Sequence, residues 1–308
     1  LAALLAKGFS VRCFDVPTRA NLAKARALKQ HDGRQVELVW GDLRSPPDVR
    51  AAVHGVKAVL HLGFVIPRLS ATGINSEDQP DFARSVNVGG TRNLLQAMCA
   101  QERPPRLVFA SSLHVYGKTQ HLPPPRTAAD PPRPVEHYAR HKVEVEGMVR
   151  GSGLEWSILR LGAALPLRLI LDPGMFDVPL DNRIEFVHTL DAGQAFANAV
   201  DCPGVWGKTL LIGGGPRCQL YYRDMLTQVL DTMGIGPLPE RLFSREPYST
   251  DWLDTAESQA LLRFQQRTFA DYTADLRRAL GPLRTLIAAL RPLVRRWLMS
   301  KSPQYRQR

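Results

Sequence analysis

The feature that most constrains the fold is a regular alternation of strand-like and helix-like segments through the first half of the chain. Apolar runs such as "VRCFDV", "VELVW", "AVLHL" and "RLVFASS" alternate with segments whose apolar residues recur every three or four positions. Strands that alternate with helices in this way form a parallel sheet, and right-handed crossovers place helices on both of its faces. The sequence therefore predicts an α/β fold built on a doubly wound parallel sheet.

In such a sheet the carboxyl ends of the strands meet at one edge, and ligands bind in the crevice there. The residues expected at those ends are Asp15, Asp42, "HLGF" at 61–64 and "ASSLHVYG" at 110–117. These positions are the first candidates for a functional site.

The composition limits the class of protein. Hydrophobic residues make up 44% of the 308 positions and charged residues 22%, which is ordinary for a globular protein. No run of about eighteen apolar residues predicts a membrane-spanning helix, and no signal peptide is visible. The four cysteines show neither disulfide nor metal-ligand spacing. We therefore expect a cytoplasmic protein with reduced thiols and no metal site.

The net charge of +11 is concentrated at one end of the chain. Residues 276–308 contain only basic charged side chains, which leaves a net charge of about +2 for all preceding residues. The body of the protein is therefore close to neutral. This distribution argues against a nucleic acid as the partner.

The stretch "YARHK" places Tyr138 and Lys142 four residues apart, on one face of a predicted helix. A lysine ammonium beside a phenol lowers the phenol's pKa, so the tyrosine can exchange a proton with a substrate oxygen. A solvated helix face is the alternative interpretation of this pair alone. Ser112, at the end of a predicted strand, supports the functional interpretation of the pair because its hydroxyl can hydrogen-bond the reacting oxygen.

This combination resembles the extended short-chain dehydrogenase/reductase family, which includes NAD-dependent sugar epimerases, dehydratases and hydroxysteroid dehydrogenases. The resemblance runs from Leu1 to about Asp275. It rests on "GDLRSPPDV" (41–49), "VLHLGF" (59–64), "NVGGTRNLLQAM" (87–98), "SSLHVYG" (111–117), "FVHTLDAGQA" (186–195) and "LLRFQQRTFADYTADL" (261–276). The sequence departs from the family pattern at four positions: Gly63 and Phe64 stand in place of two alanines, Arg263 in place of a glycine and Gln266 in place of a proline.

The resemblance divides the matching residues into two parts, and the residues after them form a third. Residues 1–160 correspond to an NAD-binding Rossmann-like domain, and residues 161–275 to a small substrate-binding lobe with segments that return to the sheet. Residues 276–308 form a basic amphipathic tail outside the resemblance.

The resemblance also assigns roles to individual residues. Ser112, Tyr138 and Lys142 are expected to be catalytic. NAD is expected to contact Tyr138 and Lys142 together with Asp15, Asp42, Leu43, Leu62, Gly63, Asn87, Ala110, Ser111 and Leu161. An acid at the position of Asp15 bonds the ribose 2′-hydroxyl and favours NAD over NADP. Arg19 lies close enough in sequence to accept a phosphate, so NADP is the less favoured alternative.

In this family the first strand ends in Gly-x-x-Gly-x-x-Gly, and that segment does not precede Leu1 here. We expect that a strand and turn of roughly fifteen to twenty residues are missing. A wrongly chosen start codon or a partial gene would equally account for the missing segment. The chain as written is expected to bind its cofactor poorly and to expose one edge of a central strand.

The substrate is less constrained. The largely apolar residues 161–176 favour a hydroxyl-bearing hydrophobic substrate, such as a steroid, a terpenoid or another lipid-like alcohol or ketone. The alternative is that these residues only form the core of the lobe. The expected reaction is hydride transfer between a secondary alcohol or ketone and NAD. A nucleotide-sugar epimerase or dehydratase that retains its NAD, and a non-catalytic cofactor-binding protein, are the alternatives.

Two association surfaces are expected. The family usually dimerises through helices that match residues 81–100 and 136–150 here, and the apolar side chains of Val86, Leu94, Leu95 and Met98 allow a homodimer. The same side chains could instead face the sheet.

The second surface is the tail, where nine apolar residues between Leu280 and Leu298 recur at spacings of 3 and 4. They form one helical face, bordered by Arg284, Arg291 and Arg295 and containing Trp297. Pro282 suits a helix start, and Pro292 is expected to kink or divide the helix. A basic amphipathic helix of this kind can lie on an anionic membrane surface. The alternative is a helix docked on its own domain or on a partner subunit.

Overall fold

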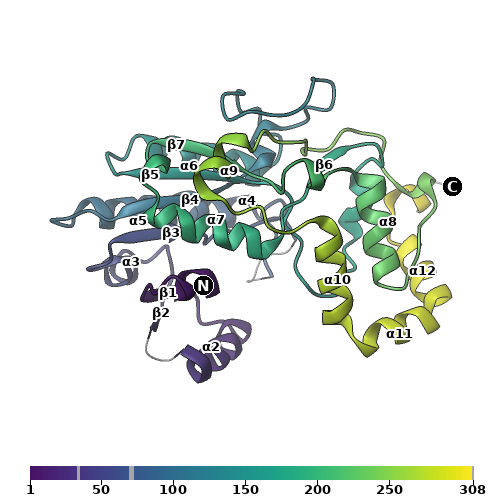
Figure 1. The fold of residues 1–308 in the computed structure, drawn as a ribbon, viewed down its shortest axis with the longest axis horizontal. Helices are drawn as coiled ribbons and strands as arrows, with labels where there is room; N and C mark the ends of the chain where they lie inside the picture. The colour runs from purple at the N-terminus through teal and green to yellow at the C-terminus, as the bar shows by residue number, and fades with distance from the viewer. Residues whose placement is uncertain (33–34, 69–72, 307–308) are drawn as a thin grey trace.

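The computed structural model of the chain describes residues 1–32, 35–68 and 73–306. Figure 1 shows two groups of elements: a layered arrangement of strands and helices, and a mostly helical lobe beside it that contains the C-terminus. Among the described residues, no helix is both long and apolar enough to cross a membrane.

The strands are β1 (Val11–Asp15), β2 (Val36–Trp40), β3 (Ala58–His61), β4 (Arg106–Ser112), β5 (Trp156–Leu161), β6 (Arg183–Glu185), β7 (Lys208–Ile212) and β8 (Gln219–Tyr221). The helices are α1 (Ala2–Ala6), α2 (Arg19–Asp32), α3 (Pro46–Val53), α4 (Pro80–Arg84), α5 (Gly90–Cys99), α6 (His137–Arg150), α7 (Thr189–Asp201), α8 (Tyr222–Thr232), α9 (Ala256–Leu262), α10 (Phe269–Leu280), α11 (Pro282–Ala289) and α12 (Arg291–Met299). Short 3₁₀ or π turns are η1 (Ser85–Gly89), η2 (Leu113–Tyr116), η3 (Pro173–Asp177), η4 (Pro203–Val205), η5 (Pro216–Cys218), η6 (Glu240–Leu242) and η7 (Pro303–Arg306).

The predicted parallel strands are all present. Strands β3, β4, β5 and β7 pair in that order, and each pair is parallel. Strands β1 and β2 form a separate parallel pair. Among the described residues, no strand pairs with the second edge of β1 or of β3.

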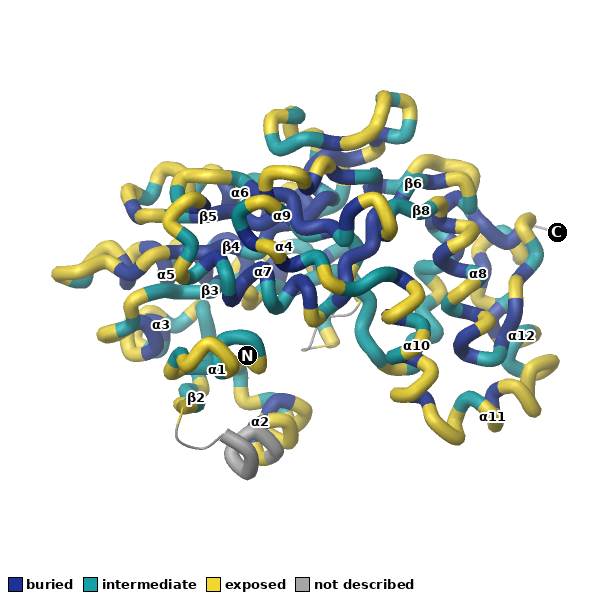
Figure 2. The backbone as a smooth tube through the Cα atoms, viewed as in Figure 1, coloured by how far each residue is buried: buried dark blue, intermediate teal, exposed yellow. Residues whose placement is uncertain are grey.

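Helices cover both faces of the parallel strands, as a doubly wound fold requires. Side chains of α3, α5 and α6 pack against one face, where Leu107, Phe109 and Ile158 are fully buried. Side chains of α7 and α9 pack against the other face, around Val108 and Leu159. Figure 2 shows buried residues concentrated in β4, β5 and the helices beside them. The predicted α/β class with a doubly wound parallel sheet is therefore confirmed.

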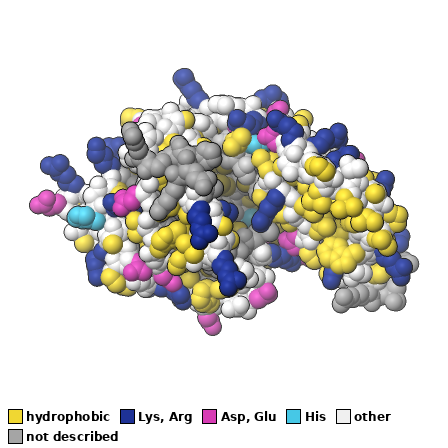
Figure 3. Space-filling model, turned by 90° about the horizontal axis from the view of Figure 1, so that it is seen from below, with side chains coloured by type: hydrophobic (Ala, Val, Ile, Leu, Met, Phe, Trp, Pro, Cys, Tyr) yellow, Lys and Arg dark blue, Asp and Glu magenta, His cyan; other side chains and the backbone are white. Residues whose placement is uncertain are grey.

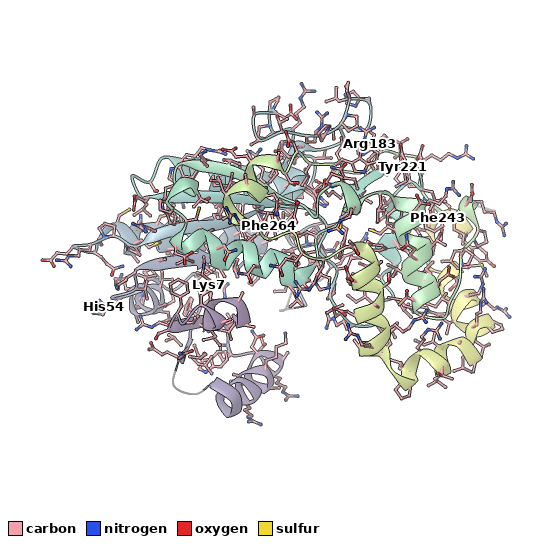
Figure 4. The ribbon with its side chains drawn as sticks, viewed as in Figure 1. Lys7, His54, Arg183, Tyr221, Phe243 and Phe264 are labelled. Atoms are coloured by element: carbon pink, nitrogen blue, oxygen red, sulfur yellow. The ribbon has the colours of Figure 1, made fainter. Side chains whose placement is uncertain are left out.

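Helix α1 is anchored on the α7 side of the fold. Lys7, which follows α1, lies beside α7 in Figure 4. Its Nζ donates to Asp201 at 2.6 Å and to Asn198 at 3.1 Å. On the opposite side of the β1–β2 pair, the Arg12 guanidinium donates to the carbonyls of Ala52 and His54 at the end of α3. These polar contacts tie the β1–β2 pair to the rest of the fold.

The helix predicted near residues 81–101 is interrupted by the π turn η1. Asn87 lies in this turn, where it accepts from the backbone N–H of Val65 at 2.7 Å and donates to the Val65 carbonyl at 2.9 Å. Periodicity alone predicts a continuous helix. The side-chain bonds of Asn87 hold the loop after β3 against the widened turn, and such π turns frequently accompany functional sites.

The lobe is built from β6, β8, η3 and helices α8, α10, α11 and α12 around a core of its own. Leu165, Leu167, Leu169 and Leu171 pack against this core. The apolar residues 161–176 therefore contribute to the interior of the lobe. The tail is also part of it, with Pro282 at the first position of α11 and a division of the helix at Leu290, two residues before Pro292.

The apolar side chains expected at a dimer interface lie in the interior of a single chain. Leu94, Leu95 and Met98 are buried in the core between α5, α6 and the sheet, and Val86 is half-buried. These side chains therefore face the sheet, which is the alternative that the sequence left open. These residues therefore offer little surface to a second subunit.

A buried ion pair links α6 to the two central strands. The Glu146 carboxylate accepts from Arg160 of β5 at 2.9 and 2.7 Å and from the Ser111 hydroxyl of β4 at 2.6 Å. The Glu146 and Arg160 side chains are 0% and 2% exposed. Burial raises the pKa of Glu146, but its bonds to Arg160 and Ser111 outweigh that effect and the pKa is lowered. Glu146 is therefore ionised and paired at neutral pH.

We expect Glu146→Gln to lower the free energy of unfolding by about 3–5 kcal/mol, because it leaves the Arg160 charge buried without its counter-charge. Denaturant unfolding followed by circular dichroism measures the change. Glu257→Gln is the matched control, since the Glu257–Lys208 pair is exposed and should contribute less than about 1 kcal/mol. Equal losses in the two variants would contradict the structural role of the buried pair.

Candidate functional site

The three side chains predicted to act together lie side by side at the carboxyl end of β4. Ser112 is the last residue of β4, and α6, which carries Tyr138 and Lys142, packs on this strand. The Lys142 Nζ donates to the carbonyl of Ala110 at 2.6 Å and lies 5.6 Å from the centre of the Tyr138 ring. The Tyr138 phenol interacts with the Ser112 hydroxyl. Their catalytic role stays a prediction.

The first turn of α6 is fixed by a carboxylate from a distant segment. Glu77 accepts from the backbone N–H of His137 at 2.9 Å and from that of Tyr138 at 3.0 Å. These N–H groups have no carbonyl partner within the helix, and a negative charge is favourable at a helix N-terminus. Glu77 therefore holds the Tyr138 backbone in place.

Burial controls the protonation of the two titratable residues. It raises the pKa of Tyr138 to about 12, an effect that the Ser112 hydroxyl opposes and the negative charge of Glu136 reinforces. Burial also lowers the pKa of Lys142 well below its usual value. Burial therefore dominates the pKa of Tyr138, and the expectation that Lys142 lowers this pKa stays a prediction. The physical reason for both shifts is that loss of solvation disfavours both charged forms.

Phe64 fills the space beside these residues. The Lys142 Nζ lies 3.5 Å from the centre of the Phe64 ring. The same ring meets the Tyr138 ring edge-on, with centres 5.9 Å apart. Phe64 is one of the departures from the family pattern, where an alanine is usual. The Phe64 ring therefore packs against both Lys142 and Tyr138.

A polar cluster that the sequence motifs did not indicate lies on the lobe side of Tyr138. The His114 ring is 6.1 Å from the Tyr138 ring and 5.7 Å from the Tyr248 ring, and its Nδ1 lies 3.7 Å from a Glu136 oxygen. Among the described residues, the buried atoms His114 Nδ1, Glu136 Oε2 and Ser249 Oγ have no hydrogen-bond partner. Burial raises the pKa of Glu136, but interactions with His114 and Ser249 outweigh it and the pKa is lowered. The three side chains therefore interact with one another next to the phenol without forming complete hydrogen bonds.

The predicted cofactor residues on the β1 side lie at strand ends. Asp15 ends β1 and is exposed, and its carboxylate accepts from the backbone N–H of Val16. Leu62 and Gly63 follow β3 and are also exposed. The Asp42 carboxylate is engaged by Arg44, whose hydrogen bonds lower the pKa of Asp42. Exposed polar groups and a glycine at this edge suit the ribose and adenine of a dinucleotide.

The side chains of the other residues predicted to contact the cofactor already contact other parts of the protein. Leu43 packs against Gly63 and Gly90, and a side chain added at Gly90 would collide with it. The Asn87 amide and the Ser111 hydroxyl are bonded to Val65 and Glu146, so neither side chain is free.

At the central strand ends, the Ala110 carbonyl holds Lys142. Leu161 pairs with Ser112 in the register of β4 and β5. The described residues contain no group of three or more His, Cys, Asp or Glu side chains that could hold a metal ion.

The residues at the carboxyl ends of β1 and β3 fit the binding of NAD. An exposed carboxylate at the end of β1 and exposed backbone after β3 are available there, and Lys142 supplies a donor beside the phenol. The Phe64 ring packs against Lys142 at this position.

Several solved structures share the fold of this chain. A short-chain dehydrogenase/reductase superfamily protein from Agrobacterium tumefaciens, solved with NAD, shows 21% identity and a TM-score of 0.68 over 91% of this chain and 100% of that chain. dTDP-glucose 4,6-dehydratase from Streptomyces venezuelae shows 24% identity and a TM-score of 0.73 over 92% of this chain and 93% of that chain. UDP-glucuronic acid 4-epimerase from Bacillus cereus shows 17% identity and a TM-score of 0.73 over 92% of this chain and 94% of that chain. At these identities the likeness concerns the fold.

No curated protein matches this chain in sequence. The family model for NAD dependent epimerases and dehydratases matches residues 1–163, which is more than half of the 308 residues. On that match, and in agreement with the resemblance carried by its motifs, the chain belongs to the NAD dependent epimerase/dehydratase family.

Proposed function

We propose that this protein is an NAD-dependent oxidoreductase that transfers a hydride to or from a carbon bearing a hydroxyl or carbonyl group. The observation that carries the proposal is the juxtaposition of Ser112, Tyr138 and Lys142 at the end of β4. Bound NAD supplies the nicotinamide that accepts or donates the hydride. The Asp15 carboxylate at the end of β1 favours NAD over NADP.

Tyr138 is the residue that moves the proton in this proposal. Its phenol donates to the substrate oxygen during reduction and takes the proton back during oxidation. The Ser112 hydroxyl lies against the same phenol, so it can orient the reacting oxygen and stabilise charge that develops on it. Lys142, held by the Ala110 carbonyl, supplies positive charge beside the phenol once a ligand replaces Phe64 as its neighbour.

A hydroxylated substrate suits the site better than an apolar one. The leucines of residues 161–176, which favoured a steroid- or lipid-like substrate, pack in the lobe core. The side chains of His114, Glu136 and Ser249 instead place polar groups with incomplete hydrogen bonds beside Tyr138. Buried polar groups of this kind favour a ligand that completes their hydrogen bonds. Nucleotide sugars, on which the similar dehydratase and epimerase act, are therefore the first substrates to test.

An epimerase or dehydratase that retains its NAD is the second candidate, since it would use the same three residues. Release of NADH separates the two functions. A dehydrogenase accumulates NADH in solution, whereas an enzyme with retained NAD converts substrate without net reduction of the cofactor.

We expect Tyr138→Phe to lower turnover by about two to four orders of magnitude and to leave the Kd for NAD within a few-fold of its original value. The lost hydroxyl acts on the proton in the transition state. Turnover of nucleotide sugars and the Kd for NAD are measured for both proteins. Tyr221→Phe, at an exposed tyrosine of the lobe, is the matched control. Retention of most turnover in Tyr138→Phe would refute the assignment.

We expect Phe64→Ala to tighten NAD binding by about ten-fold, because the ring contacts with Lys142 and Tyr138 no longer have to be broken. Calorimetric titration with NAD measures the change. Phe64→Leu keeps an apolar side chain without a ring and should give a smaller gain. Unchanged or weaker binding in a folded Phe64→Ala protein would show that the ring does not obstruct the cofactor.

A further inference from the structure

Helices α11 and α12 carry an apolar surface that the rest of the chain does not cover. Its large side chains are 42% to 66% exposed, and we call it the α11–α12 face: Leu283, Leu286, Leu290, Leu293 and Trp297. Figure 3 shows hydrophobic side chains gathered over this end of the lobe, with basic side chains around them. Contiguous exposed apolar patches of this kind mark interaction sites.

The lobe core does not account for these residues. Of the nine apolar positions between Leu280 and Leu298, four pack into the core: Leu280, Ile287, Val294 and Leu298. The other five form the α11–α12 face, with Leu283, Leu286 and Leu290 spaced along one side of α11. The sequence left open whether the tail docks on its own domain or on something else. The structure shows one side docked and a second apolar side exposed.

The docking itself uses two of the arginines. Arg284 donates to the Thr232 carbonyl at 3.0 Å, and Arg295 donates to the carbonyls of Ile235 and Pro237. Because these bonds satisfy carbonyls at and just after the end of α8, the two helices are held in a fixed orientation on the lobe. All three members of the predicted border, Arg284, Arg291 and Arg295, therefore contact the lobe, since the exposed Arg291 guanidinium lies against Gly236.

The remaining basic side chains are available for an acidic partner. Arg277, Arg291, Arg296 and Lys301 are exposed, and within the described part of the chain none of them pairs with a carboxylate. Lys301 lies over the Trp297 ring, 5.5 Å from its centre. No acidic residue occurs from residue 276 to the last residue of the sequence. The α11–α12 face is therefore apolar at its centre and positively charged at its margin.

We propose that the α11–α12 face binds the surface of an anionic lipid bilayer. The five apolar side chains enter the boundary between headgroups and acyl chains, and the exposed arginines meet lipid phosphates. A helix pair with this composition lies on a membrane without spanning it. Pairing with a second copy of the face would bring two positively charged margins together, which favours the lipid.

Binding to vesicles tests this proposal independently of the catalytic one. The intact protein is sedimented with vesicles of equal parts phosphatidylglycerol and phosphatidylcholine, and separately with phosphatidylcholine alone. We expect binding to the anionic vesicles, with a blue shift of Trp297 fluorescence that is absent in Trp297→Phe. Added salt should weaken the binding.

Two sets of variants separate the apolar and basic contributions. Leu286→Gln combined with Leu293→Gln should lower partitioning by at least about ten-fold, because both side chains would otherwise be removed from water. Arg291→Gln and Arg296→Gln should each lower it by about five-fold on anionic vesicles only. Leu190→Gln, at a leucine of α7 with 47% exposure, is the matched control and should bind normally.

Equal partitioning of the control and the double leucine variant, with both shown to be folded by circular dichroism, would overturn the proposal. A second test measures the oligomeric state of the protein by light scattering without vesicles. If the intact protein is a dimer and the double leucine variant is a monomer that still binds vesicles, the face is a self-association surface and the lipid proposal is wrong.

Discussion

The position of the candidate site depends on the buried carboxylate of Glu146. Tyr138, Lys142 and Glu146 are spaced four residues apart and share one face of α6. Glu146 is bonded to Arg160 on β5 and to Ser111 on β4, so this face is fastened to the two central strands. Ser112 is the next residue of β4. The ion pair therefore brings the phenol, the ammonium group and the serine hydroxyl to the same strand end, and Glu77 fixes the start of the helix.

The same burial that fixes the site also suppresses its charges. The raised pKa of Tyr138, about 12, makes its phenol harder to deprotonate, and the lowered pKa of Lys142 favours its neutral form. Phe64 completes this low-polarity environment by covering the ammonium group. Without a ligand, the site therefore lacks the charge that proton exchange near neutral pH requires. In the proposed function, positive charge near the phenol has two sources. One is bound NAD, whose oxidised nicotinamide is cationic. The other is Lys142, which regains its charge when water or a ligand solvates its ammonium group.

Periodicity and local motifs predict much of this structure because they report short-range order. The parallel strands, the helices on both faces and the proximity of Ser112, Tyr138 and Lys142 follow from such patterns. Long-range packing explains what they miss. Ser249 comes to lie near Glu136 only through the folding of the lobe, and the π turn at Asn87 depends on bonds to Val65. A helical wheel identifies the apolar side of the tail, yet only the fold shows that Ile287 docks while Leu286 is exposed.

The most direct test of the central claim is the ultraviolet titration of the Tyr138 phenolate with and without NAD. The absorbance of the wild-type protein minus that of Tyr138→Phe isolates this single phenol. We predict no Tyr138 phenolate at moderately alkaline pH without NAD, because burial holds the pKa at about 12. With saturating NAD we predict that the phenolate forms at a pH lower by at least about one unit. An identical titration in the two conditions would contradict the proposal that this phenol works with a bound dinucleotide.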